Sequence, residues 1–224
     1  AIVLPGFIDQ HIHGAGGSDA MDGTVADLKI IAETVAQEGT TTFLATTMTQ
    51  SKENIMNAMK AVKEYREANA ADGARVLGVH LEGPFIAAKH KGAQPLEYIA
   101  IPDEATFDEY NAACGNCIKI VSLAPEADGA MKLVSYLKEK GIRLLLSDLD
   151  YTLAPKSVRR PDDELKNWIS MLQAEGITMM IVSNNRSPKR VEEYCAELGI
   201  SYQGHAGKPN PRGLYAAMAK AGAE

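Results

Sequence analysis

The sequence has few cysteines, and their number is odd. Only three occur among 224 residues: Cys114, Cys117 and Cys195. An odd number excludes a fully paired disulfide framework and is typical of a reducing compartment, so we expect a cytoplasmic protein. Cys114 and Cys117 have the spacing of a redox or metal motif. Without further ligands beside them, however, we expect two thiols at a surface turn.

The sequence also lacks a long apolar run and an excess of basic residues. No stretch reaches the roughly 20 apolar residues that a membrane-spanning helix needs, and no signal peptide is visible at Ala1. The chain has 23 basic and 29 acidic residues, which gives a net charge of −6. This acidic balance disfavours nucleic acid as a partner. We therefore expect a globular protein that binds neither membranes nor nucleic acid.

Short apolar runs alternate with amphipathic segments along the whole chain. Hydrophobic residues make up 46% of the sequence, which is enough for a sizeable core. Such an alternation predicts a parallel α/β fold. Expected strands cover residues 6–13, 41–47, 75–81, 118–123, 142–149, 177–183 and 200–204, and expected helices cover 25–38, 52–69, 104–113, 129–140, 162–175, 188–198 and 211–221. Residues 83–102 form a long irregular excursion after the third strand, where such folds carry functional loops.

Two histidines stand at the end of the first expected strand. His11 and His13 are two residues apart, and the two-residue period of a strand places both side chains on one face. Two imidazoles on one face can chelate a divalent metal ion. The same pattern also occurs in histidines with a plain structural role, so the pair alone leaves both readings open.

The sequence around these histidines resembles the N-acetylglucosamine-6-phosphate deacetylase family of the amidohydrolase superfamily, up to about Gly141. The motifs that carry the resemblance are Pro5-Gly-Phe-Ile-Asp-Gln-His-Ile-His-Gly14, Thr40-Thr-Thr-Phe-Leu-Ala-Thr46, His80-Leu-Glu-Gly-Pro84 and Leu123-Ala-Pro-Glu126. The resemblance implies a site for zinc, iron or manganese made of His11, His13 and Glu82. It also implies that residues 91–95 contact the substrate, while His80 is expected to pack in the core.

The deacetylase family uses further site residues that this sequence does not show. These are a histidine after the fifth strand, a second histidine in a His-Leu-x-Asn-Ala-Met motif after the sixth, and a catalytic aspartate after the eighth. The sequence beyond Gly141 instead resembles the haloacid dehalogenase superfamily of phosphatases. The motifs are Asp148-Leu-Asp-Tyr-Thr152, Val182-Ser-Asn-Asn185 and Gly207-Lys-Pro209.

The phosphatase resemblance assigns a role to four residues. Asp148 is implied as the nucleophile and Asp150 as the general acid and base. Ser183 and Lys208 are implied to bind the phosphoryl group, with Mg²⁺ at Asp148 and Asp150. The family's fourth motif, an acidic magnesium-binding pair on the next strand, does not follow, so we expect metal binding at either site to be weak or absent.

The two resemblances together predict one compact barrel-like domain over residues 1–224. Residues 1–141 would be a half-barrel and residues 142–224 a Rossmann-like fragment, joined at Gly141 into a TIM-barrel-like (βα)n parallel barrel. The alternative is an open, doubly wound parallel sheet. Because both families place parallel strands in the same sense, the two segments can form one right-handed βα series.

The absence of a linker and the two incomplete sites favour an engineered chimera without efficient native activity. Whether the chain is an enzyme at all stays open at this point. One alternative is a weak metal-dependent hydrolase, either a phosphatase that uses Asp148 or a remnant of the deacetylase site. The other is a non-catalytic metal-binding scaffold. A small phosphorylated ligand or phosphate is the expected partner, and the chain is expected to be a monomer or a homodimer.

Overall fold

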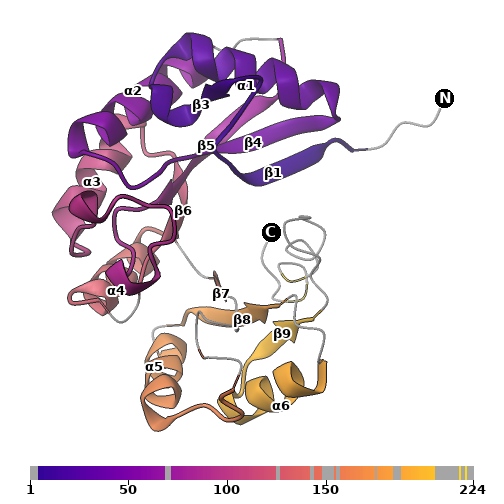
Figure 1. Cartoon of the computed structure of the whole chain (residues 1–224), viewed down its shortest axis with the longest axis vertical. Helices are drawn as coiled ribbons and strands as arrows, with labels where there is room; N and C mark the ends of the chain where they lie inside the picture. Colours follow the sequence, from indigo (N-terminus) through magenta and orange to yellow (C-terminus); the bar gives the residue numbers. More distant parts are fainter. Residues whose placement is uncertain are drawn as a thin grey trace. The chain divides into compact units, whose positions relative to one another are not determined.

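The structure, a computed structural model, shows two compact units. It describes residues 5–68, 72–124, 127–141, 144–147, 154, 157–174, 176–183, 188–204, 217 and 220. The first unit covers Ala1–Tyr136 and the second covers Leu137–Glu224 (Figure 1). No helix in these ranges is long and apolar enough to cross a membrane.

The first unit is built on a four-stranded parallel sheet. Its strands are β1 (Phe7–Ile12), β4 (Thr40–Thr46), β5 (Arg75–Glu82) and β6 (Ile118–Ser122), paired in the order β1-β4-β5-β6. All three pairings are parallel, as the alternating sequence pattern predicts. Since successive strands are neighbours and point the same way, their carboxyl ends meet at one edge of the sheet.

Three helices return the chain between these strands. They are α1 (Val25–Gln37), α2 (Lys52–Ala68) and α3 (Glu104–Ala113), and Figure 1 shows α1 and α2 along one face of the sheet. The buried residues of α1 recur at helical spacing: Leu28, Ile31, Ala32 and Val35. Thr24 caps α1 and Asp103 caps α3. The side chain of each accepts a hydrogen bond from the backbone N–H of the residue three positions later.

A short antiparallel hairpin follows His13 and was not expected from the sequence. It consists of β2 (Gly14–Ala15) and β3 (Ser18–Asp19), followed by the turn η1 (Ala20–Asp22). Gly16 and Gly17 connect the strands with φ values of 65° and 88°. Two residues with positive φ are what a tight hairpin connection requires. The two-residue strands are too short to give a periodic sequence signal.

The second unit contains another parallel sheet, in the order β7-β8-β9. These strands are β7 (Leu144–Ser147), β8 (Thr178–Val182) and β9 (Ser201–Gln203), and they are accompanied by α5 (Asp163–Ala174) and α6 (Pro188–Leu198). Helix α4 (Ala130–Glu139) spans the boundary between the units. The core of the second unit contains buried apolar side chains, which are Ile169, Leu172, Met180, Ile181 and Val191.

The predicted parallel α/β architecture is confirmed in the part of the chain that the structure describes. The four-stranded parallel sheet of the first unit corresponds to half of a βα barrel. The expected helix 211–221 falls almost entirely outside the described residues. One closed barrel over residues 1–224 stays a prediction.

The expected surface position of the two neighbouring thiols is wrong. Cys114 and Cys117 are 0% and 1% exposed. The Cys117 backbone N–H donates to the Cys114 thiol at 3.2 Å, and its carbonyl accepts the Val79 N–H of β5 at 3.0 Å. The turn that connects α3 to β6 is therefore packed against the sheet, which buries both thiols.

Candidate metal centre

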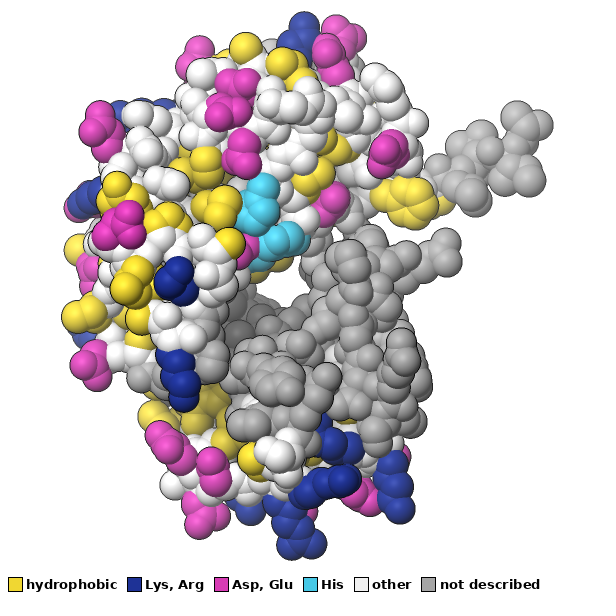
Figure 2. Space-filling model, viewed as in Figure 1, with side chains coloured by type: hydrophobic (Ala, Val, Ile, Leu, Met, Phe, Trp, Pro, Cys, Tyr) yellow, Lys and Arg dark blue, Asp and Glu magenta, His cyan; other side chains and the backbone are white. Residues whose placement is uncertain are grey.

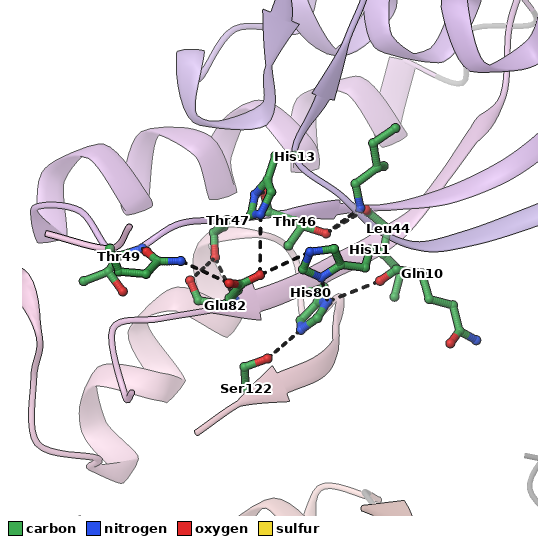
Figure 3. A network of polar contacts seen from close by, with 12 residues as sticks. Gln10, His11, His13, Leu44, Thr46, Thr47, Thr49, His80, Glu82 and Ser122 are labelled. Atoms are coloured by element: carbon green, nitrogen blue, oxygen red, sulfur yellow. Dashed lines mark hydrogen bonds and ion pairs between the residues drawn. The ribbon is translucent and has the colours of Figure 1, made fainter. Parts of the chain in front are cut away.

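His11, His13 and Glu82 come together at the carboxyl edge of the first unit's sheet. One ligand atom from each lies within 4.8 Å of the other two. The Glu82 Oε2 atom lies 3.4 Å from His11 Nε2 and 3.5 Å from His13 Nε2 (Figure 3). The structure thus places together the three residues for which the sequence predicted a shared metal site.

The parallel strands bring these residues together from distant parts of the sequence. His11 lies in β1, His13 directly after it, and Glu82 is the last residue of β5. Strand β4 lies between β1 and β5, and its Thr46 pairs with His80, two residues before Glu82. The side chains of His11 and His13 are 50% and 31% exposed. Figure 2 shows histidine side chains, in cyan, at the surface of the molecule.

The backbone of Thr46 orients the ring of His13. The Nδ1 atom of His13 lies 3.2 Å from the Thr46 carbonyl oxygen. A carbonyl can only accept a hydrogen bond, so Nδ1 carries the ring proton of the neutral imidazole. The Nε2 atom then keeps its lone pair, and this is the atom that faces Glu82. A hydrogen bond of this kind to the outer ring nitrogen is usual for histidines that bind metals.

The two oxygens of Glu82 have different surroundings. Oε1 accepts a hydrogen bond from Gln94 Nε2 at 3.0 Å. Oε2 is buried and has no hydrogen-bond partner among the described residues. A buried carboxylate oxygen without a donor is unfavourable, because it has lost its water without a replacement. A cation between Oε2 and the two Nε2 atoms would remove this cost, so the donor set fits the expected divalent metal ion.

His80 lies directly behind His11 and is buried, with 8% of its surface exposed. Its Nδ1 lies 3.2 Å from the Gln10 carbonyl oxygen and 3.3 Å from His11 Nδ1, and its Nε2 lies 2.8 Å from Ser122 Oγ. Burial, with the neighbouring His11, lowers the pKa of His80 to about 4. His80 is therefore neutral at physiological pH and supports the ring of His11.

Sequence reasoning missed the polar contacts that support the three predicted ligands. His80 was expected to pack in the core; it is buried there, but both ring nitrogens face polar atoms. The contributions of Thr46 and Ser122 were not anticipated. Each lies at the end of its strand, beside the ligands, and this position is the signal that points to them. Gln94 lies in the segment 91–95 that was predicted to contact substrate.

The predicted phosphate site can be followed only in part. Asp148, Asp150 and Lys208 lie outside the described residues, and so does the magnesium site expected at the two aspartates. Ser183 directly follows β8 and is fully buried, and its backbone N–H donates to the Gln203 carbonyl at 2.9 Å. Its role in binding phosphate stays a prediction.

Comparison with known proteins gives a family match over nearly the whole chain. The model of the amidohydrolase family matches residues 2–222. N-acetylglucosamine-6-phosphate deacetylase from Bacillus subtilis (strain 168) is 44% identical over 144 residues, which cover 63% of this chain and 36% of the relative. N-acetylgalactosamine-6-phosphate deacetylase from Escherichia coli O157:H7 is 35% identical over 145 residues, which cover 65% of this chain and 38% of the relative.

A solved structure agrees with these sequence matches. The crystal structure of N-acetylglucosamine-6-phosphate deacetylase from Pasteurella multocida superposes with a TM-score of 0.60 at 25% identity. The match covers 82% of this chain and 44% of that one. The matched part of the chain thus spans less than half of the length of each of these relatives.

The prediction of an engineered chimera without efficient activity is wrong. One family model matches the residues on both sides of Gly141, and relatives with up to 44% identity are named deacetylases. A haloacid dehalogenase fragment finds no support in these comparisons. The sequence expectation gave too much weight to three short motifs after Gly141, whose aspartates and lysine lie outside the described residues.

Proposed function

Because the chain belongs to the amidohydrolase family, we propose that it acts as a metal-dependent deacetylase on N-acetylated amino-sugar 6-phosphates. The reaction adds water across the acetamide bond and releases acetate and the free amine. The names of the relatives support this substrate class, with N-acetylglucosamine 6-phosphate first and N-acetylgalactosamine 6-phosphate second. The chain spans only 36% and 38% of these two relatives, so their activity is proposed for it and not transferred.

The observation that carries the proposal is the position of Glu82 Oε2. This buried oxygen has no hydrogen-bond partner and lies about equally far from two imidazole nitrogens. Two nitrogens and one oxygen are a donor set that suits zinc, iron or manganese, and three protein ligands leave a position open, as in catalytic sites.

The residues present divide the work of such a site between them. His11 and His13 supply neutral donors, and Glu82 supplies one negative charge to hold the cation. When bound, a divalent metal ion lowers the pKa of a coordinated water and polarises the amide carbonyl. Thr46 keeps the ring proton of His13 on Nδ1, so that Nε2 stays free to bind the cation. The exposure of His11 gives the substrate access to this edge of the sheet.

Acetate release tests the proposal directly. The chain is stripped of metal, reloaded with zinc, iron(II) or manganese, and incubated with each sugar phosphate. We expect metal-dependent release from the reloaded protein and at least a 100-fold lower rate in Glu82→Gln, which keeps the size of the side chain but removes its charge. Gln10→Ala is the matched control, because this side chain points away from the cluster (Figure 3). Equal rates with and without metal, or in Glu82→Gln, would overturn the proposal.

A further inference from the structure

Gln94 is a buried polar residue in the middle of the excursion 83–102. Its side chain is among the few polar ones in the core, at 7% exposure. The amide oxygen accepts the Thr49 backbone N–H at 2.7 Å, and the amide nitrogen donates to Glu82 Oε1 at 3.0 Å. Because Thr49 offers a donor and Glu82 an acceptor, only one orientation of the amide satisfies both contacts. Gln94 therefore bridges the segment after β4 and the end of β5.

The loop around Gln94 is held by its own hydrogen bonds. The Gln94 N–H donates to the Lys91 carbonyl at 3.0 Å, and Lys91 Nζ donates to the Gln94 carbonyl at 3.0 Å. At the base of the excursion, the Ala100 N–H donates to the Pro84 carbonyl at 3.1 Å. The loop thus closes on itself at its base and reaches the cluster through the side chain of Gln94.

We propose that Gln94 is a positioning residue that couples the excursion 83–102 to the metal ligand Glu82. This inference rests on the proposed function. By holding Oε1, the Gln94 amide fixes the direction in which Oε2 points. Glu82 then presents Oε2 to the two imidazoles.

The coupling has to act in both directions. If a closed loop improves the affinity of Glu82 for a cation, a bound cation must stabilise the closed loop by the same factor. Loss of an outer-shell partner typically lowers metal affinity by about 10–100-fold. A loop that folds independently of the cluster would show no such effect.

Two variants of Gln94 and one neighbour separate coupling from a general loss of structure. Gln94→Ala removes both contacts of the amide. Gln94→Glu keeps the size of the side chain and the bond from Thr49, but it places a second carboxylate beside Glu82. Leu96→Ala is the control, because this side chain lies in the same loop and is 56% exposed. Circular dichroism of each variant verifies its folding.

Metal affinity is measured by calorimetric titration with manganese, and backbone order by hydrogen exchange of peptides from residues 83–102 with and without manganese. We expect affinity to fall about 10–100-fold in Gln94→Ala. In Gln94→Glu the bond to Glu82 is also lost, but the added negative charge attracts the cation, so affinity should fall less. We also expect protection of the loop by manganese in the wild type and in Leu96→Ala, and little or none in the two Gln94 variants.

If Gln94→Ala kept the manganese affinity of the wild type and its loop were still protected from hydrogen exchange by manganese, the proposed coupling would be overturned. Weaker binding in Gln94→Ala together with an absence of acetate release in the wild type would support the coupling and contradict the proposed function. A wild-type protein that binds no manganese, zinc or iron would overturn both.

Discussion

The two units use the same architecture, yet their strand ends differ. In the first unit, residues at the ends of β1, β4, β5 and β6 face one another and form a connected group around Glu82. In the described part of the second unit, no three candidate ligands come together, and Ser183 at the end of β8 is buried. The motifs of the second unit were as suggestive in sequence as those of the first. In the first unit, neighbouring strands supply contacts that support the motif residues, whereas Ser183 is the only one of the four predicted phosphate-site residues that the structure describes in the second.

The largest effect should come from removing a ligand in the first unit. We expect His11→Ala and His13→Ala each to weaken metal binding by about 100-fold or more, beyond the usual loss of an outer-shell partner. Competition titration with a coloured chelator measures this affinity. An unchanged affinity in either variant would remove that histidine from the ligand set and would make the two units more alike than we describe.

The buried His80 should make the stability of the first unit sensitive to acid. Its pKa is about 4 in the folded protein and about 6.5 when unfolded, so the unfolded state binds more protons between these values. The contribution is fully present above pH 6.5 and is lost as the pH falls toward 4, by roughly 3 kcal/mol.

Urea unfolding of the metal-free protein between pH 7.5 and pH 4.5 measures this loss. His80→Gln has no titrating ring, so its free energy of unfolding should fall less over the same range. The acidic residues are common to both proteins, and the difference between the two slopes isolates His80. Parallel slopes would show that His80 titrates normally.

A matched pair of helix caps tests whether the units unfold separately. Asp103 accepts the Thr106 N–H at 2.8 Å at the start of α3, and Asp162 accepts the Leu165 N–H at 2.8 Å at the start of α5. Each Asp→Ala change should cost about 1 kcal/mol. With separate unfolding, each variant shifts one transition in calorimetry and leaves the other in place. A single transition that both variants shift would show that the units unfold together.

The smallest effect is expected from the leading aspartate of the second unit. Asp148→Asn should change the manganese affinity and the rate of acetate release by less than about twofold, because the proposed ligands among the described residues all come from the first unit. The same titration and acetate assays measure it. A large loss of metal affinity would mean that this aspartate contributes to the centre.

The sequence predicted the strands and helices well because their patterns are local. The ends of β1, β4, β5 and β6 lie within one residue of the expected ones, and His11 and His13 were placed at the end of a strand. The hairpin β2–β3 escaped prediction because two-residue strands have no period. The bond from Gln94 to Glu82 also escaped, since it depends on how a long loop folds back. The prediction that residues 142–224 come from a phosphatase was wrong, because it relied on short motifs, whereas one family model matches residues 2–222.

Metal analysis of the purified and dialysed protein tests the central claim most directly. The wild type is compared with the His11→Ala/His13→Ala double variant, and zinc, iron and manganese are measured for each. Our account predicts close to one metal ion per chain in the wild type and almost none in the variant. Equal metal content in both proteins, or none in the wild type after reloading, would contradict a metal centre on His11, His13 and Glu82.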